Sequence, residues 1–128
     1  MNFGILGEAK IAREHVVPAI LNAGHKVTHV GRRIPGQVAL PKIYGNAIET
    51  DYETLINDPS VDAIYNPLPN HLHVPYSIEA LKAGKHVLCE KPVALNLDEL
   101  SQLENAAKDS KAFFYEAFMV RSHPQWHW

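Results

Sequence analysis

Short apolar runs alternate with segments of helical apolar spacing along the chain, and this alternation constrains the fold more than any other feature. A run such as Phe3–Gly7 is typical of a buried strand, whereas apolar residues three or four positions apart predict a helix. The predicted strands are 3–7, 25–30, 47–50, 61–65, 85–89 and 111–118. Strands that alternate with helices indicate a parallel sheet with helices on both faces. We therefore predict an α/β fold of three layers (α/β/α), a doubly wound parallel sheet of about six strands.

The segments between these strands predict helices, and capping residues mark several of their ends. The predicted helices are 9–23, 35–44, 51–56, 75–83 and 96–107. Pro18 should kink the first helix or end its regular part. Asp51 is a candidate N-cap, and Asn96 with Glu99 three residues later resembles a capping box.

Composition and charge exclude several functional classes. The 128 residues fit one domain, and the formal net charge of −2 disfavours a nucleic-acid partner, because such binders carry a basic excess. No apolar stretch approaches the ~20 residues that span a bilayer, so no membrane partner is expected. The start of the chain lacks the basic segment of a secretory signal, and the single Cys89 can form no internal disulfide. We therefore expect a cytoplasmic protein.

The junction between the first strand and the first helix resembles a dinucleotide-binding turn. Its sequence, Gly7-Glu8-Ala9-Lys10-Ile11-Ala12, fits G-x-G-x-x-G/A with alanine in place of the middle glycine. Gly7 allows the tight turn, and the helix N-terminus offers free N–H groups to a pyrophosphate. Glu8 suits the helix dipole but would repel a nearby phosphate, which Lys10 can offset. This turn is a candidate pyrophosphate site.

The second predicted strand ends in a basic pair, Arg32 and Arg33. A NAD-preferring site carries Asp or Glu about 20 residues beyond the glycine turn. No acid lies between Glu14 and Glu49. Guanidinium groups bind a 2′-phosphate in a bidentate fork, so the pair predicts a preference for NADP over NAD. The alternative is a solvated basic turn.

A second candidate site is the ionisable pair Glu90-Lys91, which stands where the fifth predicted strand ends and is followed by Pro92. In open α/β sheets, ligands bind in the crevice outside the carboxyl ends of the strands. A lysine there can donate a proton or bind an anion, and a neighbouring carboxylate can tune it. The alternative is a surface turn with an ordinary ion pair.

Together these segments resemble the N-terminal half of the glucose-fructose oxidoreductase / inositol dehydrogenase / MocA (Gfo/Idh/MocA) family. The matching stretches are 4–7 with 11–12, 62–65, 67–70 with His73, 83–92, and 116–124. The run 80–92 is the most specific, and the sequence looks closest to the branch of NADP-dependent sugar and dihydrodiol dehydrogenases. The resemblance implies a Rossmann domain from an enzyme that transfers hydride between a nicotinamide and a carbinol carbon.

The resemblance also implies roles for individual residues. Lys91 would be catalytic and contact the reacting oxygen, and Glu90 would orient or tune it. Residues 7–11 would hold the pyrophosphate, and Arg121 would lie near the nicotinamide end. The residues implied to border the cofactor are Leu68, Pro69, Asn70 and His73.

Family members carry a second α/β domain that provides the substrate pocket, and this chain stops about where that domain begins. The resemblance thus implies a dinucleotide-binding domain at 1–121 and the start of a connection at 122–128. A sugar or polyol would be the substrate of a longer parent, and the 128 residues alone would bind nucleotide without catalysis. The alternative is a non-catalytic scaffold with a damaged phosphate turn.

Histidine and aromatic clusters suggest two further possibilities. His71 with His73, or His123 with His127, could indicate a metal, but no cysteine or acidic cluster completes a four-ligand set, so no metal is expected. Exposed apolar patches mark interaction sites, so the C-terminal aromatic residues predict a homo-oligomer formed through that region. These residues are Phe113, Phe114, Tyr115, Phe118, Trp126 and Trp128.

Overall fold

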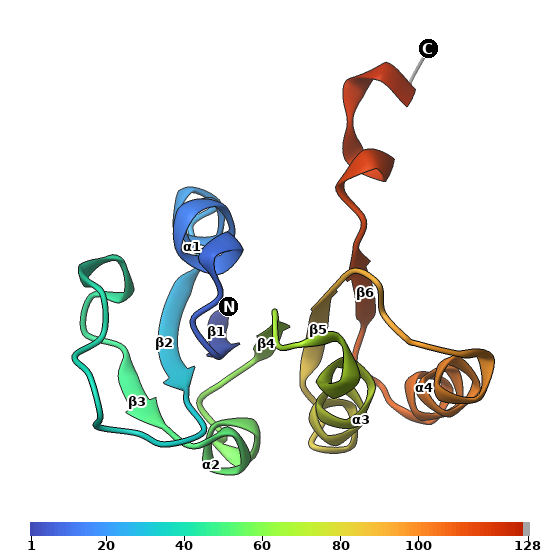
Figure 1. Ribbon diagram of the computed structural model, residues 1–128, viewed down its shortest axis with the longest axis horizontal. Coiled ribbons are helices and arrows are strands. Elements are labelled where there is room, and N and C mark those ends of the chain that lie inside the picture. The colour runs from blue at the N-terminus through green and yellow to red at the C-terminus, as the bar shows by residue number, and fades with distance from the viewer. Residues whose placement is uncertain (127–128) are drawn as a thin grey trace.

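The computed structural model describes residues 1–126 as a parallel six-stranded sheet with helices packed against it (Figure 1). The strands are β1 (Asn2–Leu6), β2 (Lys26–Gly31), β3 (Ile48–Thr50), β4 (Ala63–Asn66), β5 (His86–Glu90) and β6 (Phe114–Ala117). Their order is β3-β2-β1-β4-β5-β6, and every neighbouring pair is parallel. This is the doubly wound Rossmann order, so the predicted fold class is confirmed. The sixth strand is shorter than predicted.

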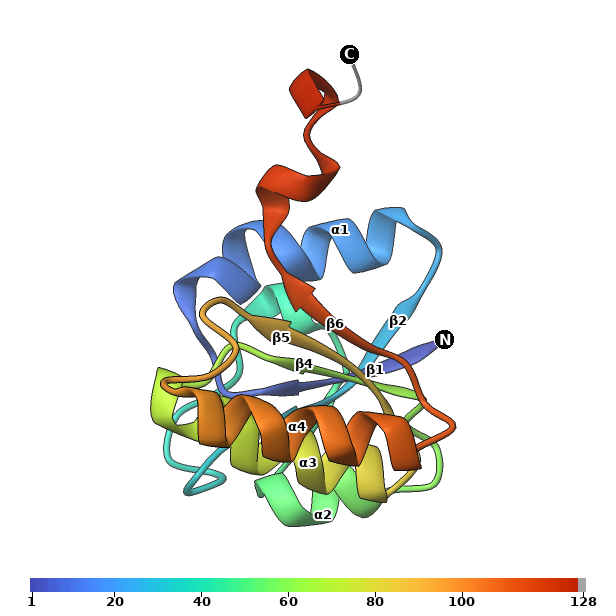
Figure 2. The same cartoon turned by 90° about the vertical axis from the view of Figure 1, so that its right-hand side faces the viewer.

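The α-helices cover the two faces of the sheet unequally. They are α1 (Val17–Asn22), α2 (Tyr52–Asn57), α3 (His73–Lys82) and α4 (Leu97–Asp109). Figures 1 and 2 show α1 on one face and the other three on the opposite face. Successive strand residues point to opposite faces, so Ile5 joins the apolar cluster under α1 and Leu6 joins the cluster under α2 to α4. In the described chain, no helix covers β5 and β6 on the α1 side.

A wide π-helical turn interrupts the first predicted helix just after it begins at Lys10. This turn spans Ala12–Val16, and regular α1 geometry starts at Val17. Pro18 follows this turn almost directly, and because it has no N–H it cannot donate the next helical hydrogen bond. The irregularity predicted around Pro18 is therefore present, on its N-terminal side.

The prediction of a short helix over residues 35–44 is wrong. Only a 3₁₀ turn forms, at Lys42–Tyr44, and Pro41 stands immediately before it. Proline cannot donate a backbone hydrogen bond and clashes with a preceding helical turn. Gly36 adds a turn with φ of 79°, outside helical space. The segment after β2 is therefore a loop.

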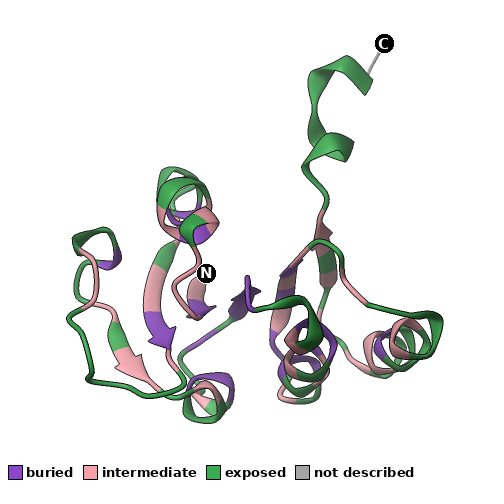
Figure 3. Ribbon diagram, in the orientation of Figure 1, coloured by how far each residue is buried: buried purple, intermediate pink, exposed green. Residues whose placement is uncertain are grey.

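After β6 the chain leaves the body of the domain. Two 3₁₀ turns, Met119–Ser122 and Pro124–Trp126, form an extension that projects on the α1 side (Figure 2). Its residues are exposed (Figure 3). Within residues 1–126, no helix has the length and apolar character needed to cross a membrane. His127 and Trp128, which entered the metal and aromatic arguments, lie outside the described residues.

Candidate functional site

The carboxyl ends of β1, β4 and β5 meet at one edge of the sheet. Gly7 follows β1, residues 67–69 follow β4, and Lys91 follows β5. The chain leaves β1 toward β2 and leaves β4 toward β5, in opposite directions across the sheet. Such a switch point is where doubly wound sheets open a crevice for a ligand. The glycine turn and the Glu90-Lys91 pair therefore lie at the same edge.

Gly7 makes the sharp turn that brings the chain close to the loop after β4. Its φ is 79°, and its N–H donates to the Gly31 carbonyl at 2.8 Å. A Cβ at Gly7 would be strained at this φ and would lie 3.1 Å from Leu68 Cδ2. Both loops line a pocket of about 480 Å³, formed by Gly7, Glu8, Ala9, Tyr52, Pro67, Leu68 and Pro69. The candidate pyrophosphate turn thus has an open, shared pocket beside it.

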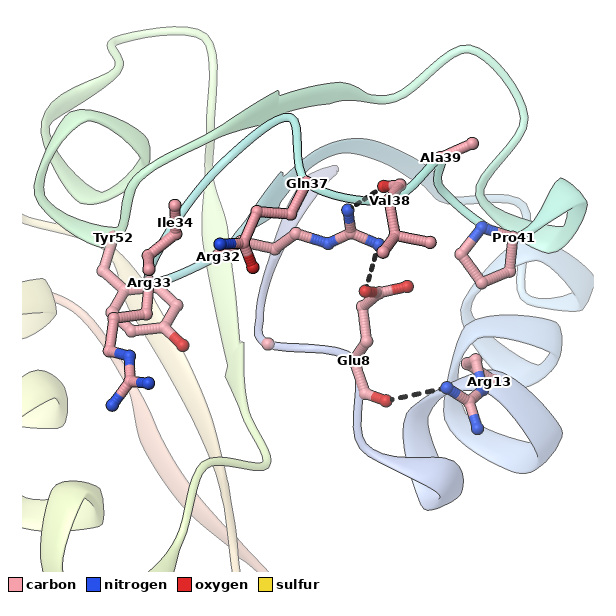
Figure 4. A pocket seen from close by; sticks show the side chains of 11 residues that line it. Glu8, Arg13, Arg32, Arg33, Ile34, Gln37, Val38, Ala39, Pro41 and Tyr52 are labelled. Atoms are coloured by element: carbon pink, nitrogen blue, oxygen red, sulfur yellow. Dashed lines mark hydrogen bonds and ion pairs between the residues drawn. The ribbon is translucent and has the colours of Figure 1, made fainter.

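A second pocket, of about 490 Å³, adjoins the first and is lined by three arginines (Figure 4). We call it the arginine pocket. Arg13 comes from the π-helical turn, and Arg32 and Arg33 come from the loop after β2. Gly7, Glu8 and Tyr52 line both pockets. Its three guanidinium groups outnumber the two carboxylates that pair with them, Glu8 and Glu49, which makes the pocket suited to an anion.

Arg32 is already engaged by the protein on several sides. Its guanidinium pairs with Glu8, donates to the Val38 carbonyl, and lies 2.9 Å from Glu49 Oε1. The same Glu49 oxygen accepts the Gly36 N–H at 2.7 Å. This backbone hydrogen bond, aided by the Arg32 guanidinium, lowers the pKa of Glu49. Arg32 therefore organises the loop as well as lining the pocket.

Arg33 points in a different direction from Arg32, beside Tyr52 (Figure 4). It is exposed, and no carboxylate within residues 1–126 lies within 4.0 Å of its guanidinium. Lys10, which was expected to offset Glu8, lies instead 3.9 Å from Glu14. Arg33 is consequently the member of the predicted basic pair that is available to a phosphate.

The Glu90-Lys91 pair is anchored through Glu90. The hydroxyl of Tyr65, on β4, donates to Glu90 Oε1 at 2.7 Å. Burial raises the pKa of Tyr65, and the Glu90 carboxylate raises it further, so Tyr65 remains a proton donor at neutral pH. Lys91 is exposed, and no carboxylate in the described chain lies within 4.0 Å of its ammonium. Glu90 is thus fixed while the Lys91 ammonium is open to a ligand.

A buried histidine ties the loop after β4 to the loop after β5. His73 Nε2 lies 2.7 Å from the Leu68 carbonyl oxygen, and its Nδ1 lies 2.8 Å from that of Pro92. Both oxygens only accept, so a ring nitrogen bonds to either of them as an N–H donor. Asn66 Nδ2 donates to the His73 carbonyl at 3.1 Å and to Ser77 Oγ at 3.2 Å. His73 positions both walls of the crevice, with no ring nitrogen left for a ligand.

Replacing His73 with Phe should lower the free energy of unfolding by about 2–3 kcal/mol, because the carbonyl oxygens of Leu68 and Pro92 both lose the imidazole as a hydrogen-bond partner. Chemical denaturation in urea measures this. His71→Phe is the matched control, since His71 is exposed and should change stability by no more than ~0.5 kcal/mol. Equal stability of the two variants would contradict the role of His73.

The remaining candidates lie around these pockets. Ile11 is half-buried just before the π-helical turn, and Asn70 is exposed at the start of a 3₁₀ turn. Arg121 lies in the C-terminal extension and lines neither pocket. Cys89 is buried, which raises the pKa of its thiol to about 12 and leaves it a poor nucleophile. Within residues 1–126, no three metal-ligating side chains converge.

The sequence did not indicate three residues of the candidate site: Tyr52, Tyr65 and Asn66. Tyr65 and Asn66 end a buried apolar strand at the crevice, and a polar residue in that position is a usable sequence signal. Tyr52 offered no such signal, because it opens α2 and reaches the pocket only through the packing of that helix.

Comparison with known proteins agrees with this geometry. Residues 1–118 match the Gfo/Idh/MocA oxidoreductase family, described as having an NAD-binding Rossmann fold. The chain belongs to this family. It is therefore an NAD(P)-binding Rossmann domain of the Gfo/Idh/MocA oxidoreductases, as the resemblance implied.

Several family relatives are similar over nearly the whole chain. A D-xylose 1-dehydrogenase (NADP(+)) from Haloferax volcanii is 37% identical over 97% of this chain and 39% of its own length. A 1,5-anhydro-D-fructose reductase from Ensifer adhaerens is 36% identical over 84% of this chain and 33% of its own length. A 3-ketoreductase from Actinomadura kijaniata, solved with NADP and TDP-benzene in an open conformation, superposes with a TM-score of 0.90 at 32% identity, covering 99% of this chain and 41% of that one. The chain thus spans about two fifths of the length of such relatives.

Proposed function

We propose that this domain binds NADP along the carboxyl edge of its sheet. The observation that carries the proposal is the continuity of the two pockets, which share Gly7, Glu8 and Tyr52. The glycine turn would hold the pyrophosphate, and the arginine pocket would hold the phosphate on the adenosine ribose. Lys91 stands at the same edge, two strands away from β1.

The residues present fit this cofactor. Gly7 leaves open the position that a Cβ would fill beside Leu68, so a pyrophosphate can approach the backbone. The loop after β2 carries no acid to bind ribose hydroxyls, and offers Arg33 without a carboxylate partner in the described chain. The relatives from Haloferax volcanii and Actinomadura kijaniata, named with NADP, support the same preference.

For the longer proteins of this family, we propose hydride transfer between NADP and a carbinol carbon of a sugar or polyol. The bound cofactor supplies the hydride acceptor or donor. Lys91 would hold a proton at the reacting substrate oxygen, and Glu90, anchored by Tyr65, would orient the Lys91 ammonium. Arg121 and Asn70 would border the nicotinamide end. The 128 residues alone would bind the cofactor without turnover, because a second domain would be needed to orient a substrate.

Calorimetry with NADP⁺ and NAD⁺, followed by a dehydrogenase assay over a panel of sugars, tests this function. We expect NADP⁺ to bind more tightly than NAD⁺ and the isolated chain to show no turnover. If neither cofactor binds, the proposal fails and the domain is a scaffold whose phosphate turn no longer works. Turnover by the isolated chain would contradict the proposal that catalysis needs a second domain to orient the substrate.

We also propose that the domain self-associates through its C-terminal region. Five large apolar residues there are at least 46% exposed, and they adjoin the part of the sheet that no described helix covers: Phe113, Tyr115, Phe118, Met119 and Trp126. A second copy would cover this apolar face.

The single buried cysteine further supports a cytoplasmic location.

Sedimentation velocity from 5 to 500 µM should therefore show a concentration-dependent increase in mass. Phe113→Ser with Met119→Ser should shift the equilibrium toward monomer, because these two side chains are the most exposed of the set, at 78% and 69%. A strict monomer at the highest concentration would contradict self-association.

A further inference from the structure

Glu8 occupies an unexpected position for an acidic residue. It follows Gly7 in the turn that faces the pyrophosphate, and its carboxylate reaches across the arginine pocket to Arg32 (Figure 4). The pair is well enclosed, with exposed side-chain fractions of 20% for Glu8 and 12% for Arg32. An anion that enters this pocket therefore encounters the Glu8 carboxylate, which is already paired with one of the three arginines, Arg32.

The two carboxylates on Arg32 are not equivalent. Glu49 is fixed independently, because the Gly36 N–H donates to the same oxygen that contacts Arg32. The Glu8 carboxylate has no second polar partner within residues 1–126, since Arg13 contacts only the Glu8 main-chain oxygen, at 3.2 Å. Release of Glu8 from Arg32 would thus break one ion pair and leave the loop around Glu49 intact.

We propose that Glu8 is a specificity-determining residue that competes with the ligand phosphate for Arg32. This proposal rests on the proposed NADP site, in which the Glu8 carboxylate and the 2′-phosphate would bind the same guanidinium group. With Glu8 on Arg32, the pocket offers Arg33 to the phosphate and keeps Arg32 from it. A dinucleotide without the 2′-phosphate does not compete with Glu8 for Arg32. Glu8 therefore lowers the ratio of the affinity for NADP to the affinity for NAD.

Calorimetric titration of the Glu8→Gln variant tests the proposal, since glutamine keeps the size of the side chain and removes its charge. We expect NADP⁺ to bind about five- to twentyfold more tightly and NAD⁺ to change by less than about twofold. Glu14→Gln is the matched control, because Glu14 is a half-exposed acid on the following turn that lines neither pocket.

A double-mutant cycle then shows whether Glu8 acts through Arg32. In an Arg32→Ala background, Glu8→Gln should lose most of its effect on NADP⁺. Adenosine 2′-phosphate, titrated against the same variants, should show the same gain without needing the rest of the dinucleotide. Thermal unfolding confirms that each variant is folded.

An unchanged or weakened NADP⁺ affinity in Glu8→Gln would overturn the proposal while leaving NADP binding itself standing. An equal gain for both dinucleotides would also overturn it, because the effect would then arise at the shared pyrophosphate. If the wild-type chain binds none of the three ligands, the proposed function fails, and this inference fails with it.

Discussion

Replacing Lys91 with Met should lower turnover by about 10²–10⁴-fold, the contribution typical of one positioned general acid or base. Lys91 is exposed and directly follows β5, and Tyr65 holds the carboxylate of the preceding residue, Glu90, in place. Methionine keeps the length and apolar stem of the side chain and removes the proton. The measurement is the steady-state rate with NADP⁺ and a sugar, in a chain extended to the length of its relatives.

One control variant and one binding measurement sharpen this test. Lys82→Met removes an exposed lysine from the end of α3, remote from the crevice, and should leave turnover unchanged. Calorimetry should show that Lys91→Met still binds NADP⁺ within a fewfold of wild type, which separates chemistry from cofactor binding. A Lys91→Met enzyme with wild-type turnover would remove the proposed catalytic role.

The second large effect concerns cofactor choice. Arg33→Ala should weaken NADP⁺ binding by about 10–100-fold, the loss expected for charged hydrogen bonds of ~1.5–3 kcal/mol to a phosphate. NAD⁺ binding should change little, because Arg33 lines the arginine pocket and not the pocket beside the pyrophosphate turn. Calorimetric titration of both dinucleotides measures the two losses.

Arg32→Ala should behave differently from Arg33→Ala. It should also weaken NADP⁺ more than NAD⁺, and in addition destabilise the loop, because Glu8 and Glu49 both lose their partner. Lys42→Ala is the control for loss of one positive charge outside both pockets. Equal losses of both dinucleotides in the two arginine variants would refute the assignment of the 2′-phosphate to this pocket.

The fold could be predicted because its signals are local. Alternating strand runs and helical spacing fix the layers, and the caps that mark helix starts are present: Asp51 accepts from the Thr54 N–H at 2.8 Å and Asn96 from the Glu99 N–H at 2.9 Å. The failure over 35–44 is also local, since Pro41 outweighed a weak helical pattern there.

The site was harder to predict, because its connections join residues far apart in sequence. The sequence placed Arg32 and Arg33 as equals, yet Glu8 and Glu49 engage the first and leave the second open. No spacing rule reveals such a pairing, which depends on how β1, β2 and β3 lie together in the sheet. His73 shows the same limit, since its two acceptors lie in separate loops.

The central claim is that one dinucleotide spans the crevice from the glycine turn to Lys91. A titration of the ¹⁵N-labelled chain with NADP⁺, followed by amide resonances in NMR spectra, tests it most directly. We expect the amides of Gly7, Arg33 and Lys91 to shift together and to yield one dissociation constant. Saturating NADP⁺ that leaves the Gly7 and Lys91 amides unmoved, or moves them with different constants, would contradict the account.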